Sequence, residues 1–181
     1  MQSRLSLGVW LCLLVTQLGC ASNPYSFGRE YRPSDDEESY FGHTVDVSYE
    51  EVRRDPQAFK GKLLGWFGVV NKMAPQAGGA TRFSLDLRFH QPRHLCSDEF
   101  ESSCRVTISD RDGGPFSTAF IVRGVDREGA ERLNVGSLVK IYGTPTGDFD
   151  DRGGPILNTE FYRQWPSGAY VTTIGKSAMR R

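Results

Sequence analysis

The segment from Thr81 to Phe89 alternates strictly between apolar and polar side chains, and this alternation constrains the fold more than any other feature of the sequence. Its apolar members are Phe83, Leu85, Leu87 and Phe89. Because successive side chains of a β-strand point to opposite faces, a period of two predicts a strand with one buried face. The core of the fold is therefore expected to lie against this face.

A second strand is predicted from Leu63 to Val70, where Gly65 and Gly68 interrupt an apolar and aromatic run. Small residues inside a strand permit a sharp bend, so this strand is expected to be strongly curved. Ser48 to Arg54 begins with a Ser N-cap, continues with acidic residues and ends with basic ones, which predicts a short helix. Further strands are predicted at residues 105–109, 116–122, 137–142 and 155–165.

Five or six short strands separated by turn signals are typical of a small barrel. We therefore predict a mostly β fold, a closed or partly open antiparallel β-barrel of the oligonucleotide/oligosaccharide-binding (OB) type with one short N-terminal helix. A β-sandwich is the alternative.

The N-terminus predicts export from the cytoplasm. Arg4 precedes an apolar run from Leu5 to Leu18, and Gly19 and Cys20 follow it. The run is shorter than the roughly 20 residues that a membrane-spanning helix needs, but it fits the hydrophobic region of a secretory signal. We predict that residues 1–19 are a signal peptide.

The segment Leu18-Gly19-Cys20-Ala21-Ser22 resembles the lipobox of bacterial lipoproteins, in which the cysteine is acylated and becomes the new N-terminus. The resemblance implies lipidation (palmitate among the chains) at Cys20 and a chain tethered to a membrane without spanning it. Ordinary cleavage after Ala21 is the alternative, and it would give a secreted or soluble periplasmic protein.

Composition divides the mature chain into three parts. Residues 20–44 hold the cysteine and an acidic run, Asp35 to Glu38, with little to bury, which predicts a flexible acidic tether. Residues 45–173 form the predicted barrel domain, and residues 174–181 a basic C-terminal tail. Lys plus Arg and Asp plus Glu both number 22, and a neutral chain is a poor partner for nucleic acid.

Several segments together resemble the starvation-inducible outer-membrane lipoprotein family. They are Pro56–Lys62, Trp66–Val70, Val139–Gly143 and the closing Tyr162 and Trp165. The resemblance implies a lipid-anchored protein of the Gram-negative outer membrane with a small β-barrel and no established enzymatic activity. In such lipoproteins, Ala21 after the acylated cysteine implies sorting to the outer membrane.

One cluster combines side chains that form disulfides or bind metals: His90, His94, Cys96 and Cys104. Two cysteines in an exported domain most simply form a disulfide, here Cys96 with Cys104, which would brace a connection between strands. The alternative is a zinc or copper site, because two imidazoles and two thiolates are a tetrahedral ligand set.

Known catalytic motifs are missing from the sequence, so we expect neither an enzyme nor a cofactor. The first functional hypothesis is a structural or protein-interaction role in the cell envelope. The alternative is a ligand-binding module that takes an oligosaccharide or a small hydrophobic molecule. The candidate contacts for an envelope protein or polysaccharide are Tyr162, Arg163 and Trp165. The alternative for the two aromatic side chains is that they close the barrel.

Overall fold

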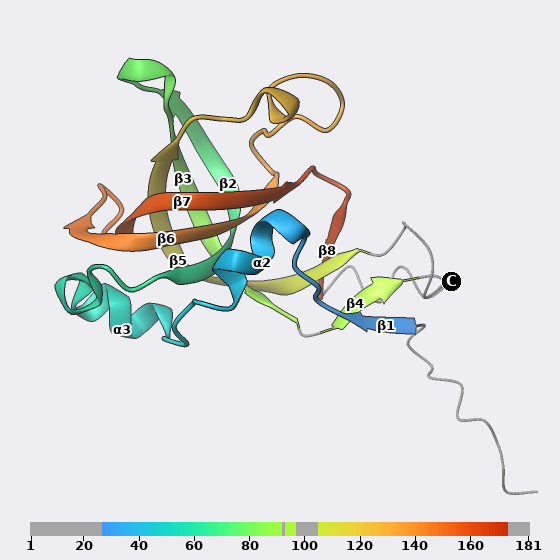
Figure 1. Cartoon of the computed structure of the whole chain (residues 1–181), viewed down its shortest axis with the longest axis horizontal. Coiled ribbons are helices and arrows are strands. Elements are labelled where there is room, and N and C mark those ends of the chain that lie inside the picture. The colour runs from blue at the N-terminus through green and yellow to red at the C-terminus, as the bar shows by residue number, and fades with distance from the viewer. Residues whose placement is uncertain (1–26, 92, 97–104, 174–181) are drawn as a thin grey trace, which may run out of the picture.

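The computed structural model describes residues 27–91, 93–96 and 105–173 (Figure 1). Its strands are β1 (Phe27–Glu30), β2 (Leu64–Pro75), β3 (Thr81–His90), β4 (Arg93–Cys96), β5 (Val106–Phe120), β6 (Leu138–Phe149), β7 (Pro155–Trp165) and β8 (Tyr170–Thr172). Its helices are α2 (Asp35–Phe41) and α3 (Tyr49–Arg54), with 3₁₀ turns at Pro56–Phe59, Ala77–Gly79 and Gly124–Asp126. The predicted signal peptide, Cys20 and the basic tail lie outside the described residues.

Five strands close into a barrel in the order β3-β2-β6-β7-β5, and β3 pairs with β5 to complete the ring. The short β8 adds to β5, and β1 pairs with β4 in a separate two-stranded ribbon. This confirms the predicted small, mostly β barrel and overturns the β-sandwich, because one sheet closes on itself instead of stacking on another.

The barrel is mixed rather than wholly antiparallel as predicted. Strands β5 and β7 run parallel, with Ser117 opposite Ile156 and Ala119 opposite Asn158. The other four contacts of the ring are antiparallel. Five strands cannot alternate in direction all the way round a closed ring, so one neighbouring pair has to be parallel.

The predicted strand periodicity is confirmed, whereas Gly68 of β2 is explained by close packing and the strong curvature of this strand stays a prediction. Phe83, Leu85 and Leu87 of β3 point into the core. A Cβ atom at position 68 would lie 2.7 Å from the ring of Phe116, so only glycine lets β2 pass this ring. The alternation fails at its last member, since Phe89 is 43% exposed.

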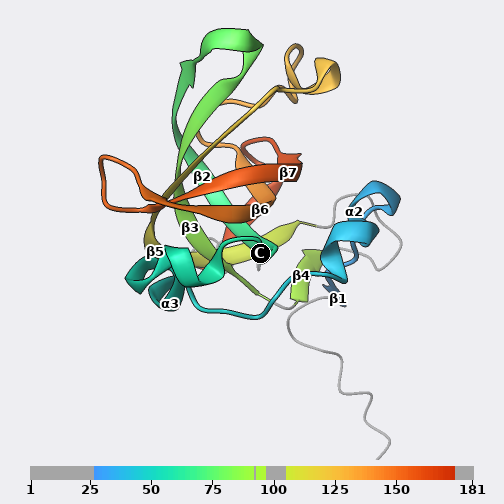
Figure 2. The same ribbon diagram turned by 60° about the vertical axis from the view of Figure 1, so that its left-hand side comes forward.

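The predicted helix at Ser48 is also confirmed as α3. The Ser48 side chain accepts the Glu51 N–H, and the Glu51 carboxylate accepts the Ser48 N–H at 3.0 Å, which closes a capping box. Tyr49 and Val52 are buried, and the Tyr49 hydroxyl donates to the carbonyl of Pro115 at 2.7 Å. These contacts fix α3 at the end of the barrel that lies away from the β2–β3 hairpin tip (Figures 1 and 2).

The prediction of a flexible tether is wrong for the part of that segment that the structure describes. Residues 27–44 contain β1 and a helix, α2, that the sequence analysis did not predict. The acidic run is the first turn of α2, and Glu37 within it is fully buried. We call residues 27–48 the strap, because they cross the end of the barrel and connect β1 to α3 (Figure 2). In the described part of the chain, no helix is long and apolar enough to cross a membrane.

Candidate functional site

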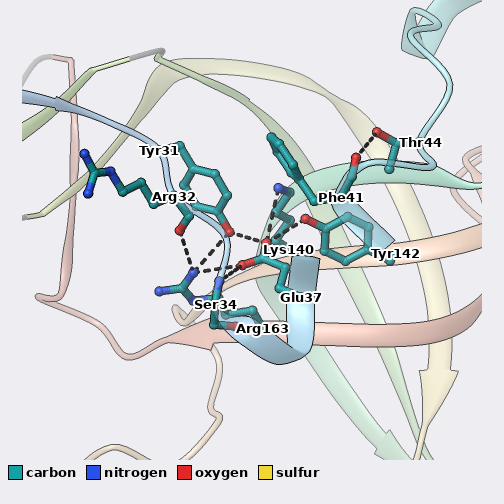
Figure 3. Close-up of polar contacts among 9 residues, drawn as sticks. All are labelled: Tyr31, Arg32, Ser34, Glu37, Phe41, Thr44, Lys140, Tyr142 and Arg163. Atoms are coloured by element: carbon teal, nitrogen blue, oxygen red, sulfur yellow. Dashed lines mark hydrogen bonds and ion pairs between the residues drawn. The ribbon is translucent and has the colours of Figure 1, made fainter. Parts of the chain in front are cut away.

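A buried carboxylate, Glu37, joins the strap to the barrel (Figure 3). Its side chain accepts hydrogen bonds from the hydroxyl of Tyr142 at 2.6 Å and from the hydroxyl of Tyr31. It also accepts the backbone N–H of Ser34 at 3.1 Å, which satisfies the first turn of α2. Because Tyr31 and Ser34 belong to the strap and Tyr142 belongs to β6, one carboxylate connects both parts.

Two cations complete the shell of Glu37. Arg163 of β7 donates Nη1 to one carboxylate oxygen at 2.8 Å, and the ammonium of Lys140 lies 3.2 Å from the other. Removing either partner of a buried ion pair is costly, because the remaining charge has no water to solvate it. The strap is therefore bound to β6 and β7 by charge as well as by hydrogen bonds.

Aromatic rings surround Lys140, which is only 4% exposed. Its ammonium lies 4.1 Å from the ring centroid of Tyr31, 4.5 Å from that of Phe41, 4.8 Å from that of Tyr142 and 5.2 Å from that of Phe67. The faces of such rings attract cations. Two of the four rings come from the strap, so Lys140 is enclosed only when the strap lies on the barrel.

These contacts shift the pKa values of the buried groups. Burial alone would raise the pKa of Glu37, but hydrogen bonds from Tyr142, Tyr31 and Arg163 and the charge of Lys140 lower it to about 2. Burial lowers the pKa of Lys140 to about 8, although Glu37 opposes the shift. Burial and the same carboxylate raise the pKa values of both tyrosines. At neutral pH, Glu37 and Lys140 are therefore a charged pair.

Beside this cluster, a groove of about 620 Å³ lies between the strap and the barrel and is open to solvent. This volume is in the range of small-molecule sites. The strap contributes Tyr31, Phe41 and Val47 to its lining, and the barrel contributes Trp66, Phe67 and Phe89. Phe41 and Phe89 are each 43% exposed, so the groove presents aromatic surface to solvent.

Charged side chains line the same groove. Glu30 and Asp46 are exposed, and Arg88 is half-buried and donates Nη1 to the carbonyl of Asp110 at 3.0 Å. Lys140 also reaches the groove lining, but Glu37 and the rings already surround its ammonium. The groove thus combines an apolar wall with side chains of both signs.

Tyr162, one of the predicted binding residues, is part of the barrel's packing rather than of a binding surface. Its side chain is buried, and its hydroxyl donates to the carboxylate of Asp126 at 2.6 Å and accepts the backbone N–H of Arg123 at 2.9 Å. The Asp126 carboxylate also accepts from the Arg123 side chain at 2.9 Å. Tyr162 therefore closes the barrel near the β5–β6 connection and does not present its ring to a partner.

Arg163 and Trp165 lie beside the cluster rather than on an open platform. Arg163 is bound to Glu37, and its guanidinium carbon lies 4.8 Å from the ring centroid of Trp165. The indole in turn stacks on Phe67 at 5.8 Å between centroids. Trp165 thus packs against Phe67 of the groove wall, and Arg163 packs against Trp165.

The His and Cys cluster is only partly described. The imidazole of His90 stacks on Phe67 at 4.7 Å and lines the groove. His94 and Cys96 belong to β4, where Cys96 pairs in register with Phe27, and Cys104 lies outside the described residues. The Cys96–Cys104 disulfide and its metal alternative therefore stay predictions. Among the side chains that the structure does describe, no group of three or more His, Cys, Asp or Glu could hold a metal ion.

Sequence analysis missed the two central residues of the cluster, Glu37 and Lys140. A signal existed for each. Ser34 followed three residues later by Glu37 is the pattern of a capping box and predicts a helix start. Lys140 interrupts the apolar run from Leu138 to Tyr142, and a cation inside a buried strand requires a partner.

No protein-family model matches the chain, and no curated protein sequence matches it. The likeness to the starvation-inducible lipoproteins therefore stays a prediction, and the function has to be argued from the groove and the strap.

Proposed function

We propose that this protein is a lipid-anchored, non-catalytic binding module of the cell envelope, located at the outer membrane. Its anchor would be Cys20, and its binding site would be the groove between the strap and the barrel. The aromatic groove carries this proposal, because ligand sites are typically concave, mostly apolar and lined by a few polar groups.

The same observation favours ligand binding over a purely structural role. Single exposed apolar side chains are common on protein surfaces, but Phe41 of the strap and Phe89 of β3 come together at one concave site, which fits ligand binding better than a spacer role. A non-catalytic role is supported by the state of Glu37. Its carboxylate is saturated by hydrogen bonds and two cations, so it is poorly suited to act as a general base.

The position of the strap supports a role close to a membrane. The strap, which contains the later part of the predicted tether, is bound to the barrel, and seven positions of sequence separate Cys20 from Phe27, where β1 begins. The barrel is thereby held near the proposed anchor instead of standing off on a long spacer.

Two measurements test this proposal. The first is the intact mass of the protein extracted from native envelopes. We expect a chain that begins at Cys20 and carries acyl chains, whereas an unmodified chain that begins at Ser22 would refute the lipid anchor.

The second is titration of the purified protein with the neutral apolar dye N-phenylnaphthylamine, whose fluorescence rises in apolar sites. Val47→Trp should fill the groove and abolish the rise. Val125→Trp is the control, because Val125 is 82% exposed and does not line the groove. Equal dye binding by both variants would refute the groove as the binding site.

A further inference from the structure

We propose that the groove holds one acyl chain of a zwitterionic phospholipid, phosphatidylethanolamine, taken from the membrane to which the protein is anchored. This inference rests on the proposed function and names the ligand class for the same site. Three observations carry it: the apolar wall of the groove, the signs of the charges along it, and the short chain between the anchor and the strap.

The wall of the groove suits a flexible apolar chain. Phe41 projects from the strap and Phe89 from the end of β3, and both remain 43% exposed. Trp66 and Phe67 form the barrel side. An acyl chain lying against Phe41 and Phe89 would remove their exposed apolar surface from water without needing a directional polar contact, while the buried rings of Trp66 and Phe67 back the groove.

The charges along the groove match a headgroup that carries both signs. A phosphatidylethanolamine headgroup has a negative phosphate next to a positive ammonium. Arg88 can meet the phosphate, since its bond to Asp110 uses one of the five N–H donors of a guanidinium. The carboxylates of Glu30 and Asp46 can meet the ammonium. An anionic headgroup such as that of phosphatidylglycerol also has a phosphate for Arg88, but it has no ammonium to pair with these two carboxylates.

Lys140 does not compete for the phosphate. Its ammonium is 3.2 Å from Glu37 and is enclosed by four aromatic rings. The charges of Glu37 and Lys140 cancel each other at the floor of the groove. Arg88, Glu30 and Asp46 are therefore the side chains that discriminate between headgroups.

The length of the tether brings the groove to the bilayer. Seven peptide steps separate Cys20 from Phe27, and seven steps span at most about 25 Å in any conformation. β1 then runs from Phe27 to Glu30, and Glu30 lines the groove. A barrel on so short a connection keeps its groove within reach of the lipids around its own anchor.

Photolabelling in vesicles tests the inference. The full acylated protein is placed in phosphatidylglycerol vesicles that contain a small fraction of phosphatidylethanolamine with a diazirine on one acyl chain. After irradiation, mass spectrometry locates the labelled peptides. We expect labels on the peptides that carry Trp66 and Phe89. Labels found only outside the groove would overturn the inference.

Two matched variants test whether the aromatic wall of the groove binds the acyl chain. Phe89→Ser should reduce labelling about tenfold, because the acyl chain loses its contact with the exposed part of the Phe89 ring, about half of the side chain. Phe149→Ser should leave labelling unchanged, since Phe149 is similarly exposed at 48% but does not line this groove. Equal loss in both variants, at unchanged unfolding midpoints, would overturn the inference.

The headgroup prediction has its own test. Diazirine-labelled phosphatidylethanolamine should label the groove more strongly than diazirine-labelled phosphatidylglycerol, and the double variant Glu30→Gln/Asp46→Asn should abolish this preference. The same preference in the double variant would overturn the assignment. If the protein is acylated and binds the apolar dye in the groove but takes up no phospholipid label, the inference fails while the proposed function stands.

Discussion

Replacing Glu37 with Gln should destabilise the fold by about 3 kcal/mol at neutral pH. Burial raises the pKa of Glu37, but hydrogen bonds from Tyr142, Tyr31 and Arg163 and the charge of Lys140 outweigh it and lower the pKa from 4.5 to about 2. This difference corresponds to about 3 kcal/mol of preference for the charged form in the folded state. Gln keeps the size of the side chain but removes the charge that compensates Lys140 and Arg163. The figure agrees with the roughly 3–5 kcal/mol lost when one partner of a buried ion pair is removed.

The stabilisation by Glu37 depends on pH. Because the folded-state pKa of Glu37 is lowered, its contribution to the free energy of unfolding is present above about pH 4.5 and is lost as the pH falls towards 2. The difference between the wild-type protein and Glu37→Gln should therefore shrink from about 3 kcal/mol at pH 7 to nearly zero at pH 2.

Urea unfolding followed by the fluorescence of Trp66 and Trp165 measures this difference at each pH. Glu38→Gln is the matched control, because Glu38 is the next residue of α2 and is exposed. It should change the free energy of unfolding by less than about 0.5 kcal/mol. A loss below 1 kcal/mol for Glu37→Gln at pH 7, or a loss that does not vary with pH, would refute the reasoning.

Three further predictions concern the barrel and its charged pair. Burial lowers the pKa of Lys140 to about 8, so between pH 8 and 10.5 the unfolded chain keeps the ammonium proton that the folded protein has lost. The free energy of unfolding should therefore rise with pH in this range. Urea titrations should show this rise in the wild type and not in Lys140→Met. Gly68→Ala should lower the free energy of unfolding by about 1–3 kcal/mol through its clash with the ring of Phe116, whereas Gly124→Ala, with open space around the new methyl group, should not. Tyr162→Phe should cost about 1–3 kcal/mol in the same assay, because a buried carboxylate and a backbone N–H lose their shared partner; an unchanged midpoint would contradict its role in closing the barrel.

The barrel was largely predictable because its signals are local. The alternation from Thr81 reflects which face of one strand is buried, and a sequence shows this directly. The parallel contact of β5 with β7 was missed for a different reason. It follows from the number of strands in the closed ring, which no single segment reveals.

The site was much less predictable, because its central contacts join residues that are far apart in sequence. Glu37 pairs with Lys140 and Arg163, more than a hundred residues away. An acidic run such as Asp35 to Glu38 is usually solvated, so composition alone predicted a flexible tether. Only the partners in β6 and β7 show that one of its four carboxylates is buried.

Native mass spectrometry of the protein released from its own membranes shows whether the groove holds a lipid. We predict that the wild-type protein retains a non-covalent adduct with the mass of phosphatidylethanolamine and that Val47→Trp, which fills the groove, does not. A wild-type protein without any bound small molecule, or the same adduct in Val47→Trp, would contradict the assignment of the groove as a ligand site.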